Sequence, residues 1–176
     1  MNNARITELT ETIGVAFGDP ATFARIRQRI SGGSFTGNAL LRSLRMLSAD
    51  SSPDNLPLYL SLLDNAEVAP QVIPLLGRFS DAKVSEALLS RLPKLEGPAW
   101  SSAMEVLCAR VPSSNELLDH IADGKLPKSQ LTAFYARQMA SLNDAKLTAR
   151  LEAEWGKLGQ SSDEVKAEIQ RLSTAY

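Results

Sequence analysis

Arginine is the residue type whose spacing most clearly suggests chemistry in this sequence. In a helix, Arg25 and Arg29 share one face, and Arg42 and Arg45 share another. If the two helices form a hairpin, these four residues predict a basic patch that binds an acidic partner or phosphate groups. Alternatively, the cations simply favour the C-terminal halves of their helices, where the helix dipole stabilises positive charge. Five arginines and no acidic residue lie between positions 20 and 49: Arg25, Arg27, Arg29, Arg42 and Arg45.

The other residue types that catalyse reactions lack partners at useful spacing. His120 is the single histidine, and its neighbour Asp119 points about 100° away on a helix, so it cannot orient the ring. Cys108, the single cysteine, lies in the apolar run MEVLCARV, which predicts a buried and inert thiol. Glu164 and Glu168 share a helix face, but their segment is polar and predicts a solvated surface. We therefore expect no catalytic, cofactor or metal site and no enzymatic activity in the chain itself.

Composition narrows the class of protein further. The chain has 176 residues, 44% of them hydrophobic and 22% charged, which is typical of a globular domain. Its net charge of −1 argues against nucleic acid as the partner, because such proteins rely on a positive field. No apolar run approaches the roughly 18 residues of a membrane-spanning helix, so no membrane insertion is expected. The sequence begins without the basic and apolar regions of a signal peptide.

The elements that position these residues are predicted to be helices throughout. Apolar residues recur at steps of three and four, as in Ile6, Leu9, Ile13 and Phe17, which places them on one helix face. No sustained alternation typical of strands occurs. We predict an all-α fold of about ten short helices. The same period recurs in three further groups: Leu40, Leu41, Leu44 and Leu47; Leu88, Leu89, Leu92 and Leu95; Leu147, Leu151, Trp155 and Leu158.

Helix-start residues recur about every thirty residues, which is the length of one helical hairpin. Each precedes an apolar pattern and is expected to cap a helix with its side chain. Because a short helix cannot bury its apolar stripe alone, hairpins at this period predict an irregular α-α superhelix of HEAT-like repeats. We expect it to form a single domain over 1–176. The predicted capping residues are Asp19, Asp54, Asp81, Asn115 and Asp144.

The largest apolar residues are predicted to stabilise this repeat array from within. Leu44, Leu89 and Trp155 are expected in the core. The remaining aromatic residues have no basic residues interleaved, as a single-strand nucleic-acid surface would require, and are expected to pack in the core or between repeats. They include Trp100, Phe134 and Tyr135.

Several runs resemble one family. They are LLDHIADGKLP (117–127), SLNDAKL (141–147) and the triplets Ala136-Arg137-Gln138 and Glu154-Trp155-Gly156. Earlier, IGVAFGDPATFARIR and LLGRFSDAKVSEALLSRLPKL resemble the opening and middle of the same segment. This is the HEAT-like helical segment of large planctomycete and verrucomicrobial proteins that carry a c-type haem (CxxCH) domain and a propeller-like domain classed as a membrane-bound dehydrogenase. The resemblance extends from about Ile6 to Leu172 and is strongest from Leu117 to Leu158.

The resemblance implies a function for the chain and a context for it. Neither CxxCH nor a propeller is present in this sequence, so the resemblance transfers no redox residue to it. It implies a segment of a larger, exported redox protein whose haem lies elsewhere. We expect a non-catalytic helical repeat module that acts as an interdomain spacer or a protein-interaction scaffold. The alternatives are a HEAT-like protein that binds nucleic acid through the Arg25–Arg45 patch and, last, a lyase-like protein that handles a tetrapyrrole.

Overall fold

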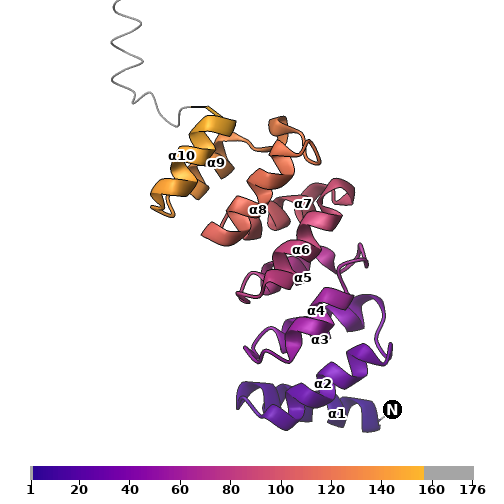
Figure 1. Cartoon of the computed structure of the whole chain (residues 1–176). Helices are drawn as coiled ribbons and strands as arrows, with labels where there is room; N and C mark the ends of the chain where they lie inside the picture. The colour runs from indigo at the N-terminus through magenta and orange to yellow at the C-terminus, as the bar shows by residue number, and fades with distance from the viewer. Residues whose placement is uncertain (1, 157–176) are drawn as a thin grey trace, which may run out of the picture. The chain divides into compact units, whose positions relative to one another are not determined.

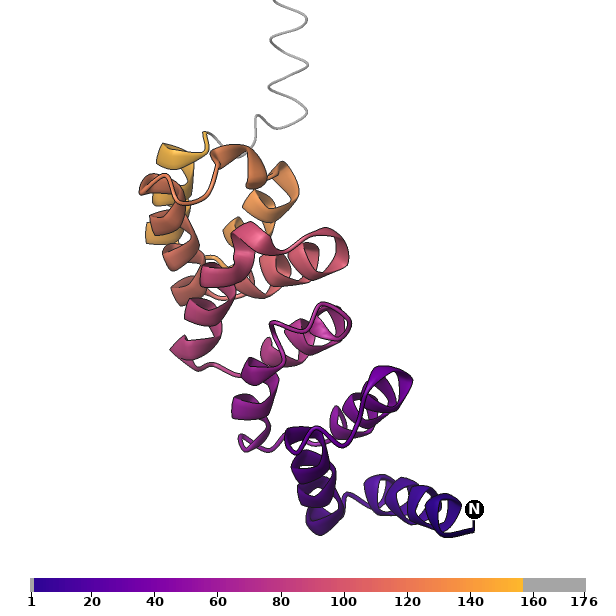
Figure 2. The ribbon, with the colours of Figure 1, turned by 90° about the vertical axis from the view of Figure 1, so that its right-hand side faces the viewer.

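The computed structural model describes residues 2–156, and for positions 2–5 and 8 the helical backbone alone. Within that range the fold is all-α, as predicted, with ten α-helices, two short 3-10 helices and no strand. Ribbon views are given in Figures 1 and 2. The helices are α1 (Asn2–Ala16), α2 (Pro20–Ser31), α3 (Gly37–Leu47), α4 (Asn55–Ser61), α5 (Ala69–Leu76), α6 (Ala82–Arg91), η1 (Leu92–Lys94), α7 (Gly97–Leu107), α8 (Val111–Ala122), η2 (Lys128–Gln130), α9 (Ala133–Ala140) and α10 (Ala145–Glu154).

The chain divides into two compact units between Val106 and Leu107. In the first unit the helices follow one another in chain order from α1 (Figures 1 and 2), and the helices that pack together are close in sequence. Thus α2 packs on α3 and α4, α3 packs on α5, and α4 packs on α5. In the second unit α10 packs against both α8 and α9.

Three of the five predicted capping residues begin their helices as expected. The carboxylate of Asp19 accepts from the amides of Ala21 and Thr22, and Asp81 accepts from that of Lys83. Asp144 accepts from the amide of Leu147 at 2.7 Å. These bonds satisfy amides that have no partner inside the helix, which is why Asp is favoured there.

The other two capping predictions are wrong, for different physical reasons. Asp54 precedes α4 in helical geometry without a side-chain cap, and its carboxylate lies 3.7 Å from Arg27 instead. Helix α8 begins at Val111, where Pro112 fits the first turn because proline lacks an amide hydrogen. Asn115 therefore lies inside α8 and donates to the carbonyl of Val111.

Burial confirms the predicted core at two positions and corrects the third. Leu44 and Leu89 are 1% and 5% exposed. Trp155 is only half-buried, because it follows the last residue of α10, and its indole N–H donates to the carbonyl of Leu131. Of the other aromatic residues, Tyr135 is buried but Phe134 is exposed, since adjacent residues on α9 face different sides.

Helix α1 contacts α2 closely, and its glycine explains why. A side chain at Gly14 would collide with the hydroxyl of Thr22, so only glycine allows this approach. The apolar residues Ile6, Leu9 and Ile13 do share a helix face, as predicted, but this face is exposed to solvent. The expectation that every stripe lies in a shared core is therefore wrong for α1, because α2 and α3 cover its other side.

Candidate functional site

The four arginines of the predicted patch lie on neighbouring helices α2 and α3. Arg25 donates to the Thr22 hydroxyl at 2.7 Å and lies 3.9 Å from Asp19. Arg29 pairs with Glu11 of α1, and its guanidinium lies 4.4 Å from the centre of the Phe35 ring. Arg42 and Arg45 are exposed, and no hydrogen bond or ion pair to them is found within residues 2–156.

Two pockets bring parts of the patch together. Arg29 and Arg42 line one of about 290 Å³ with Phe35, Ser43 and Met46. Arg25 and Arg29 line another of about 500 Å³, whose remaining walls come from α1. Arg45 lines neither pocket. Arg29 therefore shares a pocket with Arg25 and another with Arg42.

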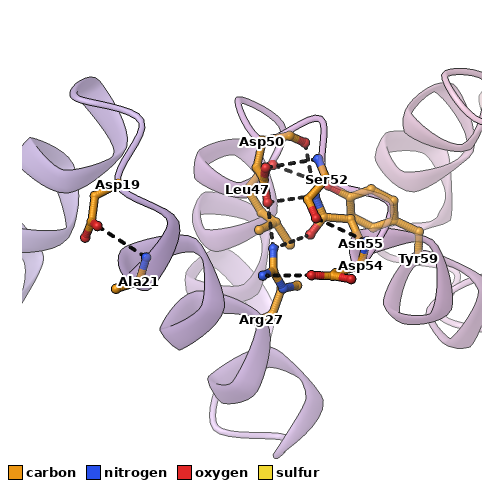
Figure 3. A network of polar contacts seen from close by, with 9 residues as sticks. All are labelled: Asp19, Ala21, Arg27, Leu47, Asp50, Ser52, Asp54, Asn55 and Tyr59. Carbon is orange, nitrogen blue, oxygen red and sulfur yellow. Dashed lines mark hydrogen bonds and ion pairs between the residues drawn. The ribbon is translucent and has the colours of Figure 1, made fainter.

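The fifth arginine, Arg27, forms a polar network that the sequence analysis missed. Its Nη1 donates to the carboxylate of Asp50 at 2.6 Å and to the side-chain oxygen of Asn55 at 3.0 Å (Figure 3). Asn55 is fully buried, and its Nδ2 donates to the Asp50 carbonyl at 3.0 Å and carboxylate at 3.2 Å. Together with Asp54, these residues form what we call the Arg27 network. It joins α2 to the loop before α4.

Neighbouring groups extend the Arg27 network. The amide of Ser52 donates to the Asp50 carboxylate, and the hydroxyl of Tyr59 donates to the carbonyl of Leu47 at 3.4 Å (Figure 3). Burial raises the pKa of Tyr59 to about 12, which favours the protonated hydroxyl that donates this bond. The signal in the sequence was the polar run Asp50–Asn55 between apolar helices, but nothing in that run indicates which arginine it binds.

Arginines join helices in the same manner elsewhere in both units. Arg78 donates to the carbonyl of Ser48, and Arg91 binds Asp64 through Nε and Nη2 at 2.8 and 2.9 Å. In the second unit, Arg150 donates to Asn115 and to the carboxylate of Asp119. With the Arg27 network, these bonds join residues 23 to 35 positions apart, close to the thirty-residue spacing of the sequence.

The residues considered for catalysis are held apart from one another. Asp119 binds Arg150, whereas His120 Nδ1 donates to the carbonyl of Glu116 at 3.1 Å, so the two side chains have different partners, as expected. Cys108 is fully buried, as predicted, and burial raises the pKa of its thiol to about 12. Glu164 and Glu168 lie outside the described residues.

One further pocket, of about 470 Å³, lies beside the Arg91–Asp64 pair. Apolar residues such as Leu63, Leu95 and Ala99 form much of its wall. Within the described residues, no three histidine, cysteine or acidic side chains are grouped as a metal ion would require. No helix there is long and apolar enough to span a membrane.

Comparison with known proteins adds no relative. No family model, no curated protein and no solved structure matches this sequence.

Proposed function

We propose that this chain is a non-catalytic helical-repeat module that spaces and orients neighbouring domains of a larger protein and offers a surface to a protein partner. The observation that carries the proposal is the set of arginine bonds across 23 to 35 residues, which tie one helical segment to the next. Two consecutive helices joined only by apolar contacts can slide or rock. A directional, charge-assisted bond between them fixes their angle.

The buried groups of the Arg27 network support a role in holding neighbouring helices at a fixed distance. Arg27 and Asp50 retain only 18% and 15% of their side-chain exposure, and Asn55 retains none. Separating the helices costs free energy, because these largely buried groups would lose their partners. The network therefore resists separation of α2 from the α3–α4 loop, as a spacer of fixed length requires.

The family resemblance supports a larger context for this module. From it we propose that the chain is part of an exported redox protein whose c-type haem belongs to another domain. In this proposal His120 and Cys108 have structural roles. The partners are neighbouring domains of the parent chain or a separate protein.

The stiffness is tested by single-molecule energy transfer within the first unit. Cysteines introduced at the exposed positions Ser31 and Ser90 take the dyes, whereas the native Cys108 is fully buried. The proposal expects one narrow distance distribution, which broadens with Arg27→Ala. The matched control Arg42→Ala removes an exposed arginine that joins no helices and should leave the distribution unchanged. A broad distribution in the unsubstituted background would contradict a spacer.

A second candidate function, binding of nucleic acid, is supported by one observation. Arg42 and Arg45 are exposed and have no acidic partner in the described part of the chain. Phosphate binding would give an affinity for short duplex DNA that falls steeply with salt. The pairing of Arg29 with Glu11 counts against it. A fluorescence titration at two salt concentrations, repeated with Arg42→Glu, decides between the two functions.

A further inference from the structure

Helix α1 presents a row of large apolar side chains to solvent. Ile6, Leu9 and Ile13 are 55 to 57% exposed, and Phe17, just beyond the helix, is 86% exposed. Their steps of three and four residues place them along one side, which we call the α1 stripe. Five large apolar side chains are exposed in the described residues, and four of them belong to this stripe. Such clustering marks an interaction surface, whereas single exposed apolar residues are ordinary.

A groove with basic residues adjoins the α1 stripe. The pocket of about 500 Å³ between α1 and α2 is lined by Ile6, Thr7, Thr10, Glu11, Arg25 and Arg29. Ile6 belongs to both features, so the stripe and the groove form one continuous surface. The arginines therefore lie along one edge of an apolar strip.

These arginines keep the capacity to bind another acidic group. The Arg25 and Arg29 side chains are 52% and 40% exposed, although each has a partner in the chain. A guanidinium has five N–H donors, and Arg25 uses one of them on Thr22. Arg42 of the adjoining pocket has no acidic partner within the described residues.

We propose that the α1 stripe and its groove bind an amphipathic helix of a protein partner that carries acidic side chains along one edge of its apolar face. Apolar residues of such a helix cover Ile6, Leu9 and Ile13 at matching helical spacing. Its carboxylates meet the arginine edge, and this electrostatic complementarity sets the orientation of the helix. A second copy of this chain would bring a second set of the same arginines to the contact, which disfavours it as the occupant.

The proposal deepens the scaffold function, because it names the chemistry of the partner. The two proposals can fail separately. A narrow dye-to-dye distance distribution without binding of a helix would contradict only this proposal. Binding of a helix with a broad distribution would contradict only the spacer function.

The probe is a short, fluorescent, synthetic amphipathic peptide with leucines at helical spacing and glutamates along one edge. Anisotropy titrations use the full chain. We expect the glutamate peptide to bind at least about tenfold more tightly than the same peptide with lysines in place of the glutamates. Ile13→Asp should weaken binding by about tenfold or more, because it places a charge in the apolar strip. Phe134→Asp, at an exposed apolar residue of the second unit, is the matched control and should leave affinity unchanged.

The charge component is tested with Arg25→Gln, which removes the cation together with the guanidinium bond to Thr22. It should weaken binding of the glutamate peptide several-fold without weakening binding of the lysine peptide, with circular dichroism confirming the fold. Equal affinity for both peptides, or full binding by Ile13→Asp, would overturn the proposal. So would self-association of the unmodified chain in sedimentation equilibrium that Ile13→Asp abolishes, because a second copy would then be the occupant.

Discussion

Helices α1 and α3 carry the same apolar pattern but are covered differently. The α1 stripe is more than half exposed, whereas Leu40, Leu44 and Leu47 of α3 are 6%, 1% and 0% exposed. The difference lies in their neighbours, because α3 packs against α1, α2 and α5, whereas α1 packs against α2 and α3. The period of a sequence therefore determines that a helix has an apolar face, and the position of the helix in the fold determines whether that face is buried.

The two helices also differ in the polar bonds around them. The loop after α3 holds Asp50 and the buried Asn55, which Arg27 fixes to α2. Helix α1 is held by the pair between Glu11 and Arg29 and by the close approach of Gly14 to Thr22. In the first junction both ion-pair partners are largely buried, with 18% and 15% of their side chains exposed, whereas in the second Glu11 is largely buried but Arg29 keeps 40% of its side chain exposed.

Truncating one residue in each stripe should give the largest difference in the free energy of unfolding. Leu44→Ala leaves a cavity among fully buried neighbours and should lower the free energy of unfolding by about 2–5 kcal/mol. Ile13→Ala removes an exposed side chain and should change it by less than about 0.5 kcal/mol. Urea denaturation followed by circular dichroism measures both. Equal costs would mean that the α1 stripe is covered in solution.

Removing Arg27 should have the next largest effect. Arg27→Ala leaves the buried Asn55 and the nearly buried Asp50 without their charged partner, which should cost about 2–4 kcal/mol. Arg42→Ala, on the exposed side of α3, should cost less than about 0.5 kcal/mol. The same denaturation experiment compares them, and indistinguishable midpoints would show that the network does not stabilise the junction.

Helix α10 offers an intermediate case that sharpens the comparison. Leu147 and Leu151 are fully buried, whereas Trp155 at the end of the same stripe is half-buried and bonded to Leu131. Trp155→Phe keeps most of the ring contact but loses this hydrogen bond, so we expect a loss of about 0.5–1.5 kcal/mol. Thermal unfolding reports it. A loss as large as that of Leu44→Ala would instead indicate full burial.

The exposed pair of Arg91 and Asp64 should give the smallest effect, visible as a pH dependence. The hydrogen bond from Arg91 lowers the pKa of Asp64 from its ordinary 3.8 in the folded chain. A lowered carboxyl pKa stabilises the fold above pH 3.8 and ceases to do so as pH falls through the folded value. Arg91→Ala should therefore reduce the stability difference between neutral and acidic pH slightly. Unfolding curves at pH 7 and below pH 3.8 measure this, and an unchanged difference would contradict it.

The parts that were predictable depend on neighbours in the sequence. The helices follow from steps of three and four, and the caps at Asp19, Asp81 and Asp144 follow from bonds that span two or three residues. The burial of Cys108 follows from its apolar run. The predicted cap at Asp54 was wrong because its carboxylate lies near Arg27, which is distant in the sequence, and does not bind the amides of α4.

The candidate site was predictable only as a set of residue types. Four arginines were selected by spacing, yet the partners that distinguish them, Glu11 for Arg29 and Thr22 for Arg25, depend on how α1 and α2 pack. Spacing left Arg27 out of this set and indicated no partner for it. Its role depends on Asp50 and Asn55, more than twenty positions away.

The sequence alone determined the all-α class, the helix periods and most of the helix starts, because these depend on backbone hydrogen bonds and side chains within a turn of one another. Only the tertiary structure decided that the α3 stripe is buried and the α1 stripe exposed, and that Arg27 forms a buried network while Arg42 faces solvent. The physical reason is that burial and charge pairing are properties of the neighbours in space, which the local sequence does not specify.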